Sequence, residues 1–145
     1  MSWWPRAGRR STSAAPRRGS SSSTCRRRER RRAREEGARV VLVTSESQKW
    51  RATPYAGIEL CLLRQNEEKG GALLLKLAAG ARFPLHDHPG GEEVYVVEGA
   101  VTIGGRKLAA GDYLWTEPGG RHDASADRDT LLFVSSPKGI EILEK

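Results

Sequence analysis

The sequence predicts an all-β domain, an antiparallel sandwich or barrel, that follows a basic N-terminal segment. Three observations predict this fold class. From residue 40 onward the chain contains about eight to ten short apolar or alternating runs, the pattern that β-strands produce. Gly, Pro, Asn and Asp residues separate these runs at short intervals and mark turns. The same part of the chain shows no convincing helical periodicity, which leaves strands packed as a sandwich or barrel.

Residues 1–38 differ in composition from the rest of the chain. The formal net charge is +7, but residues 1–36 contain twelve Arg and three Glu, which gives +9 there and −2 in the remainder. The segment is rich in Ser, Pro and Gly and has almost no aliphatic residues, so it cannot bury enough apolar surface to offset its chain entropy. We therefore expect a disordered Arg- and Ser-rich tail over residues 1–38 and one folded domain over residues 39–145.

Three interpretations of this tail stay open. A basic arm binds nucleic acid through its phosphates, in a salt-dependent way and without sequence specificity. An Arg- and Ser-rich leader with few acidic residues also resembles an organellar transit peptide. The third interpretation, which we favour, is an extension without function, so we expect no specific nucleic-acid partner.

The sequence indicates a cytoplasmic protein. The tail lacks the apolar core of a secretory signal peptide, and we expect no membrane association. Cys25 lies in the tail and Cys61 in a predicted strand, so the two do not suggest a disulfide, which fits a reducing compartment.

In the first half of the domain, the predicted strands begin with residues 40–43, the apolar run Val-Val-Leu-Val. Residues 45–57 are mostly polar and predict a loop. Residues 58–64 alternate and predict the second strand. Residues 66–71, Asn-Glu-Glu-Lys-Gly-Gly, predict a turn into a strand over residues 72–77.

In the second half, turn signals and apolar runs follow one another closely. Gly104 and Gly105 form a two-residue hairpin signal. Residues 118–120, Pro-Gly-Gly, predict a bend, and the polar residues 123–129 predict a loop. The predicted strands are residues 92–98, 100–103, 106–108, 113–116, 130–135 and 140–143.

All three histidines of the chain lie in two glycine-rich stretches, residues 80–99 and 111–122. His86 and His88 are two positions apart, so in an extended segment both imidazoles point to the same side. His122 comes from a distant strand and would complete a group of three imidazoles. This pattern indicates a metal site. The alternative is that His86 and His88 cap a loop and that His122 is a turn residue.

Glu92 is the fourth candidate ligand. In the predicted strand 92–98, Glu92, Val94 and Val96 share one face, and Glu93 points to the other. A lone ionised carboxylate among inward-facing valines is costly to bury, and a metal ion beside it removes that cost. Three imidazoles and a carboxylate suit zinc, iron, manganese, nickel, cobalt or copper without choosing between them.

The first stretch resembles the first motif of the cupin superfamily. That motif is Gly, five residues, His-x-His, three or four residues, Glu, six residues and Gly. Gly80, His86, His88, Glu92 and Gly99 match it without deviation.

The second stretch resembles the second cupin motif more loosely. That motif is Gly, five residues, Pro-x-Gly, two residues, His, three residues and Asn. Gly111, Pro118, Gly120 and His122 correspond to it, with six residues before the proline and one between Gly120 and His122. Position 126 is Ala where the motif has Asn.

The sequence in and around both motifs is most similar to the cupin domain of the ChrR-type anti-sigma factors, and the resemblance covers about residues 40–143. It implies a double-stranded β-helix, also called a jelly-roll barrel. It also implies that one divalent transition metal is held by His86, His88, Glu92 and His122.

Two classes of function follow from such a site. Four protein ligands on an octahedral ion leave two adjacent positions for a small oxygen-chelating substrate. Iron with O2 would give a dioxygenase, and a redox-inert ion acting as a Lewis acid would give an isomerase. The alternative is a non-enzymatic sensor of the ChrR-like type. Residues 1–39 contain no His and one Cys, so we do not expect the zinc-binding helical domain with which those anti-sigma factors grip their sigma factor.

The sequence names no catalytic residue beyond these ligands. Tyr113, Trp115 and Asp123 lie near the second motif and are candidates to line the pocket. A small domain with a metal in its interior has little room for an apolar core. We therefore expect a homodimer formed through an outer sheet face, with Tyr95 or residues 73–75 as the contact.

Overall fold

The computed structural model describes residues 24–28 and 40–144. The chain divides into two units, residues 1–40 and 41–145, which are considered separately. In the first unit, residues 24–28 form a short helical turn. The remainder of the predicted disordered tail lies outside the described residues, and the boundary at residues 38 and 39 stays a prediction.

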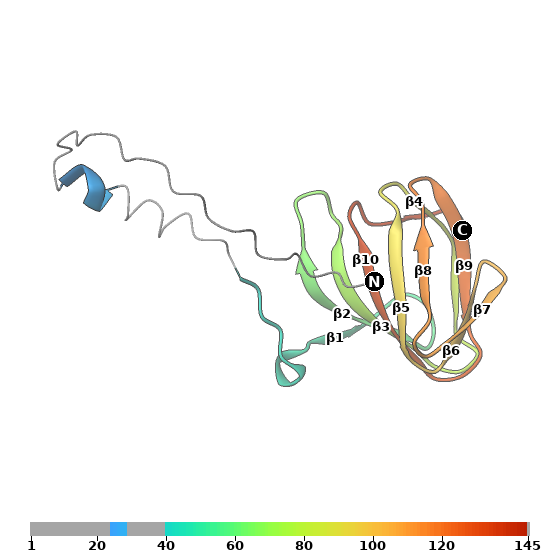
Figure 1. Ribbon diagram of the computed structural model, residues 1–145. Helices are drawn as coiled ribbons and strands as arrows, with labels where there is room; N and C mark the ends of the chain where they lie inside the picture. Colours follow the sequence, from blue (N-terminus) through green and yellow to red (C-terminus); the bar gives the residue numbers. More distant parts are fainter. Residues whose placement is uncertain (1–23, 29–39, 145) are drawn as a thin grey trace, which may run out of the picture. The chain divides into compact units, whose positions relative to one another are not determined.

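The second unit consists of two antiparallel sheets (Figure 1). One sheet has six strands in the order β1-β2-β3-β10-β5-β8. Its strands are β1 (Trp50–Ala52), β2 (Ile58–Gln65), β3 (Gly71–Leu77), β10 (Thr130–Ser136), β5 (Glu92–Glu98) and β8 (Tyr113–Thr116). The fold is therefore the predicted all-β jelly-roll.

The other sheet has five strands in the order β11-β4-β9-β6-β7. They are β11 (Glu141–Ile142), β4 (Arg82–His88), β9 (Gly120–Ala126), β6 (Ala100–Ile103) and β7 (Arg106–Ala109). A single 3₁₀ turn, η1 (Ser45–Ser47), precedes β1 in the described part of the chain. No helix among the described residues is long and apolar enough to span a membrane.

Along strand β5, alternate side chains face the interior between the two sheets. Glu92, Val94 and Val96 are buried, whereas Glu93 and Tyr95 are exposed, as the sequence predicts. The buried valines join one apolar cluster with inward-facing residues of both sheets. Its other buried members are Ile58, Leu77, Ala81, Val101, Ile103, Leu108, Ala124, Ala126, Leu132 and Val134.

The predicted first strand at residues 40–43 is wrong. These residues form no strand, and Val40, Val41 and Leu42 are exposed. The outer edge of β2 is taken instead by β1, which lies in the segment predicted to be a loop and pairs Trp50 with Cys61. An apolar run needs a neighbouring strand edge to form a ladder, and its composition alone does not supply one.

The predicted loop over residues 123–129 is also wrong, because β9 continues to Ala126. His122, Ala124 and Ala126 are buried on one face of β9, which pairs with β4 on one side and β6 on the other. Alanine gives little hydrophobic contrast, so this alternation is faint in the sequence. The loop is confined to residues 127–129.

Candidate metal centre

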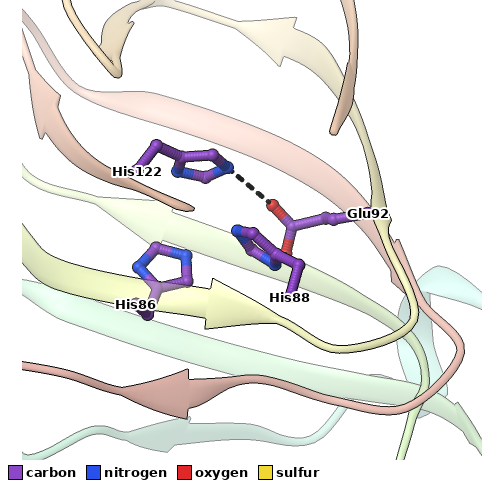
Figure 2. A group of neighbouring side chains, drawn as sticks. All are labelled: His86, His88, Glu92 and His122. Carbon is purple, nitrogen blue, oxygen red and sulfur yellow. Dashed lines mark ion pairs between the residues drawn. The ribbon is translucent and has the colours of Figure 1, made fainter. Parts of the chain in front are cut away.

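The four predicted ligand residues meet between the two sheets (Figure 2). His86 and His88 lie on β4, and His122 lies on the neighbouring strand β9, directly opposite His86 in the register. Glu92 is the first residue of β5 and belongs to the facing six-stranded sheet. The group therefore closes across the interior of the barrel.

A glycine turn carries the chain from β4 to β5 and places Glu92 opposite the histidines. The Gly91 N–H donates to the carbonyl of His88 at 3.1 Å, and Gly91 has a φ of +78°, which favours glycine. A Cβ at this position would lie 2.7 Å from Cη2 of Trp115 and 2.9 Å from the carbonyl oxygen of Thr116. The turn is thus closed to other residues by conformation and by packing.

The donor atoms of the four side chains all lie within 4.8 Å of one another. A carboxylate oxygen of Glu92 lies 3.4 Å from Nδ1 of His88, and the other lies 3.5 Å from Nε2 of His122. Donors bound at about 2.1 Å to one ion are separated by at most about 4.2 Å. A modest contraction would therefore bring all four into coordination.

Burial and hydrogen bonding support a cation at this position. The exposed fractions are 4% for His86, 0% for His88, 6% for Glu92 and 8% for His122. In the described part of the chain, neither ring nitrogen of His88 or of His122 has a hydrogen-bond partner. A buried polar group without a partner costs about 1–3 kcal/mol. A metal ion bound by one nitrogen of each ring would remove part of that cost.

His86 differs from the other two histidines because one ring nitrogen is satisfied. Its Nδ1 lies 2.7 Å from the carbonyl oxygen of Pro84. A carbonyl only accepts, so Nδ1 carries the proton and donates. Nε2 then keeps a free lone pair. A hydrogen bond from the distal nitrogen to a carbonyl is the usual way in which a metal-binding histidine is held in one tautomer.

The electrostatics favour neutral imidazoles, which is the form that binds metal. Burial is the largest effect at His88 and lowers its pKa to about 4, against the opposing attraction of the Glu92 carboxylate. Burial also lowers the pKa of His86, although its hydrogen bond to Pro84 acts in the opposite direction. Both rings are therefore uncharged at neutral pH.

A cavity of about 360 Å³ adjoins the group, a volume suited to a small molecule. His86, Glu92 and His122 line it, whereas the fully buried His88 does not. Most of the remaining wall is apolar and comes from both sheets. The apolar side chains are Leu60, Leu62, Leu73, Leu75, Phe83, Val94, Ile103, Ala124, Leu132, Val134 and Ile140.

Apart from the candidate ligands, the polar side chains of the cavity wall are either already hydrogen-bonded or exposed. Thr53 donates to the carbonyl of Ile58 at 2.9 Å, and Ser136 donates to that of Gly139 at 2.9 Å. Gln65 and Lys69 are exposed. A larger groove of about 670 Å³ shares only Thr53 with this cavity and contains none of the four candidate ligands, so we do not connect it with this site.

Three residues predicted to line the pocket do not do so. Tyr113 and Trp115 lie on exposed positions of β8, because its alternation turns Leu114 towards the core. Asp123 lies 3.6 Å from a guanidinium nitrogen of Arg82. The prediction that Glu93 points away from the site is confirmed.

Four leucines of the cavity wall are functional residues that the sequence alone does not predict. Leu60 and Leu62 on β2 and Leu73 and Leu75 on β3 line the cavity. The signal was available in the alternation of β2, but β3 is an unbroken apolar run whose inward face cannot be read locally. Because Leu73 and Leu75 face the cavity, they are not available for the predicted dimer contact.

Comparison with known protein families shows the family of this chain. The sequence profile of the ChrR cupin-like domain matches residues 38–138. The chain belongs to this family. Comparison of this ChrR-like cupin with curated protein sequences gives no match.

Solved structures share the cupin fold with this ChrR-like cupin. One, provisionally named an acetylacetone dioxygenase, is from Methylibium petroleiphilum PM1; it is 19% identical, with a TM-score of 0.69, and covers 75% of this chain and 84% of that one. An acetylacetone dioxygenase from Acinetobacter johnsonii is 13% identical, with a TM-score of 0.63 and coverages of 92% and 86%.

A third structure is that of SigE in complex with the anti-sigma ChrR from Rhodobacter sphaeroides. It is 22% identical to this chain, with a TM-score of 0.55, and covers 79% of this chain and 82% of that one. At these identities the three likenesses establish the fold and leave the activity to be argued from the site.

Proposed function

We propose that this ChrR-like cupin is a metal-dependent enzyme of the dioxygenase or isomerase type that acts on a small oxygen-chelating substrate. In this proposal His86, His88, Glu92 and His122 hold one divalent transition metal. The observation that carries the proposal is a buried group of donors, two of whose imidazoles lack hydrogen-bond partners among the described residues, opening onto an apolar cavity.

In such a site, some residues would bind the ion and others would bind the substrate. The three histidines and Glu92 would fix the ion against the wall of the barrel. The leucine-rich cavity would exclude water and hold an apolar substrate body. The ion would supply oxygen chemistry if it is iron, or Lewis acidity if it is a redox-inert metal.

The cavity favours the dioxygenase type. An isomerase must move a proton between carbon atoms, which calls for a positioned acid or base. Apart from the candidate ligands, the described cavity wall offers only engaged hydroxyl groups and the exposed side chains of Gln65 and Lys69. A chelating substrate that ionises readily needs no such group. The fold shared with two proteins named acetylacetone dioxygenases agrees with this choice.

A non-enzymatic sensor is the second candidate. It is favoured by membership of the ChrR cupin-like family and by the fold shared with ChrR, which forms a complex with SigE. In this case the same group would bind a metal and a small ligand reversibly, and the cavity would recognise the ligand without turnover.

Elemental analysis followed by an aerobic assay separates these candidates. Protein loaded with Fe²⁺ is mixed with 2,4-pentanedione and then with a panel of hydroxyketones and catechols under air. An enzyme of the dioxygenase type consumes O2 as substrate disappears, and His122→Ala abolishes both. No turnover across the panel, with tight reversible ligand binding, would favour the sensor.

We also propose that the protein is cytoplasmic and forms a homodimer through the outer face of the six-stranded sheet. Tyr95, Val97, Tyr113 and Trp115 are exposed on the two adjacent strands β5 and β8. Large apolar side chains gathered on one sheet face are typical of an interaction surface. A monomer in light scattering at micromolar concentration would count against the dimer.

A further inference from the structure

Strand β4 contains an irregularity directly before the first histidine. In its pairing with β9, Phe83 lies opposite Ala124, but His86 lies opposite His122. Pro84 and Leu85 therefore share a single partner position, that of Asp123, which is the arrangement of a β-bulge. A bulge leaves main-chain groups unpaired in the sheet and changes the direction of the side chains that follow it.

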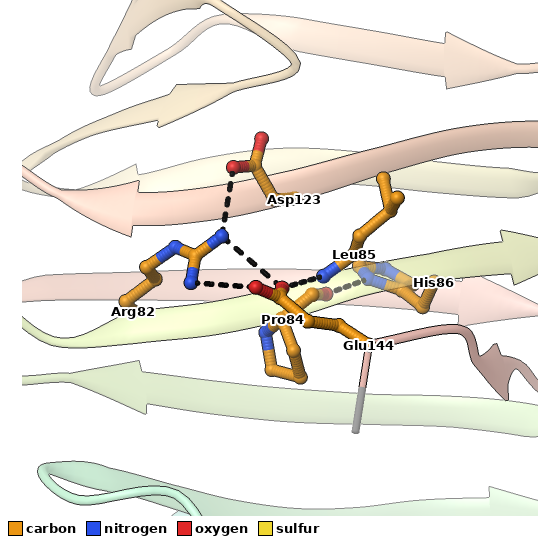
Figure 3. Close-up of polar contacts among 6 residues, drawn as sticks. All are labelled: Arg82, Pro84, Leu85, His86, Asp123 and Glu144. Atoms are coloured by element: carbon orange, nitrogen blue, oxygen red, sulfur yellow. Dashed lines mark hydrogen bonds and ion pairs between the residues drawn. The ribbon is translucent and has the colours of Figure 1, made fainter.

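The main-chain groups of Leu85 are bonded to residues 143 and 144, and Figure 3 shows the bond to Glu144. The Leu85 N–H donates to Oε2 of Glu144 at 3.0 Å. The Leu85 carbonyl accepts from the N–H of Leu143 at 2.9 Å. The segment that follows β11 thus binds the main chain of the bulge on the side of β4 that faces away from β9.

The Glu144 carboxylate is itself held in place. Two guanidinium nitrogens of Arg82 donate to its two oxygens, each at 3.1 Å. A bidentate pair of this kind fixes orientation as well as distance. Arg82 begins β4 and Glu144 follows β11, so the carboxylate is anchored to the same strand whose bulge it caps.

The bulge connects Glu144 to the candidate metal site through a single peptide unit. The Leu85 N–H, which donates to Glu144, and the Pro84 carbonyl, which accepts from Nδ1 of His86, belong to the same peptide. A peptide unit is planar, so holding its N–H fixes the direction of its carbonyl. A hydrogen bond from the N–H to a carboxylate also polarises the unit and strengthens the carbonyl as an acceptor.

We propose that Glu144 is a positioning residue for His86: it holds the Pro84–Leu85 peptide so that the imidazole keeps its proton on Nδ1 and presents Nε2 to a metal. This inference rests on the metal site proposed above. It assigns a role to a side chain outside the group of four and outside both sequence motifs.

The test compares variants of the full chain with Co²⁺ as the probe, measured by competition with a chelator. Loss of an outer partner of a metal-binding histidine weakens metal binding about 10–100-fold. We expect Glu144→Ala to weaken Co²⁺ binding about ten-fold, at the low end of that range. Glu144→Gln keeps an acceptor for the Leu85 N–H and should lose less. Glu141→Ala removes an exposed carboxylate from β11 and serves as the matched control, with unchanged affinity.

A second measurement reads the imidazole directly. In metal-free protein, ¹⁵N NMR should show His86 with its proton on Nδ1, and Glu144→Ala should give a mixture of the two tautomers. Thermal unfolding of each variant shows that the protein is folded at the temperature of the binding assay. Should the alanine variant not fold, Glu144→Gln carries the same two measurements.

The outcomes separate this inference from the metal site on which it rests. If wild-type protein binds no Co²⁺, the proposed metal site fails, and the tautomer of His86 still decides the role of Glu144. If Glu144→Ala keeps both the wild-type affinity and the tautomer, the positioning role is overturned while the metal site stands. Equal losses in Glu144→Ala and Glu141→Ala would also overturn it, because β11 would then act only as a strand.

Discussion

Glu92 and Glu93 are neighbours in the sequence and lie on opposite faces of β5. Glu92 is buried between the sheets, with its oxygens 3.4 Å and 3.5 Å from nitrogens of two imidazoles. Glu93 is exposed on the outer face and accepts a hydrogen bond from the Tyr113 hydroxyl at 2.9 Å. One position along a strand thus separates a group suited to metal chemistry from an ordinary surface contact. The inner face and the outer face of the six-stranded sheet should therefore respond differently to every change.

The largest difference is expected for metal binding. Glu92→Gln removes the only carboxylate of the inner group and leaves an amide, which is a much weaker ligand for a divalent cation. We expect this variant to lose bound metal, whereas Glu93→Gln keeps about one ion per chain, as a site of this kind should. Plasma emission spectrometry of the two dialysed variants measures this. Equal metal contents would remove the distinction between the faces.

Acid should also act through the inner face. The pKa of His88 is about 4 in the folded protein and 6.5 ordinarily, so the folded state favours the neutral ring. The stability that this contributes is fully present above pH 6.5 and is lost as the pH falls towards 4. The urea midpoint of metal-free protein should fall across that window.

His88→Gln lacks the titrating ring and is the control for this titration, so its midpoint should fall less. In the folded protein, protons compete with a metal for the same nitrogens only near the lowered pKa of the buried ring, so metal affinity should fall as the pH drops towards about 4. Metal retention that is undiminished well below pH 4, where even the buried His88 ring is protonated, would argue against an imidazole-dominated site.

Gly91 directly precedes Glu92 of the inner face and lies against Trp115 of the outer face. Substitutions at Gly91 and at Gly105 can therefore be compared for their effect on stability. Gly91→Ala places a methyl group against the Trp115 ring and the Thr116 carbonyl, in addition to a positive φ. Gly105 has a similar φ of +77° but nothing within 4 Å of an added Cβ, so Gly105→Ala carries only the backbone cost of a left-handed conformation, about 1–2 kcal/mol.

We expect Gly91→Ala to lose about 2 kcal/mol more than Gly105→Ala in the free energy of unfolding, since overpacking costs about 1–3 kcal/mol. Denaturant unfolding of both variants measures this difference. Equal losses would mean that the ring of Trp115 moves aside freely and that the outer face does not constrain the turn beneath it.

The smallest effect is expected on the outer face itself. Tyr113→Phe removes the hydrogen bond to Glu93, which also raises the pKa of the Tyr113 hydroxyl. An exposed contact of this kind contributes about 0.5–1 kcal/mol or less to stability. Metal content should be unchanged. A Tyr113→Phe protein that loses metal would show that contacts on the outer face affect metal binding between the sheets.

The same contrast explains what the sequence could predict. The group of four was accessible because strict alternation decides which face a strand residue occupies, and the histidines and Glu92 lie on strands with clear limits. The prediction for Tyr113 and Trp115 is wrong because proximity to the second motif in the sequence does not decide which face a strand residue occupies, and β8 turns both to the outer face.

Other features depend on partners that are distant in the sequence. The run at residues 40–43 is apolar, but β1 occupies the edge that it would have needed. The bulge at Leu85 exists only in the register of β4 against β9, and Glu144 lies about 60 residues away in the chain. No local sequence pattern contains such information, so the residues that surround the site become apparent only from the folded structure.

Anomalous X-ray diffraction from crystals of the Co²⁺-loaded protein would locate a bound ion among these four side chains. We expect one strong anomalous peak per chain, about 2.0–2.2 Å from a donor atom of each of His86, His88, Glu92 and His122. No peak between these side chains, or a peak held by other residues, would contradict the proposed metal site.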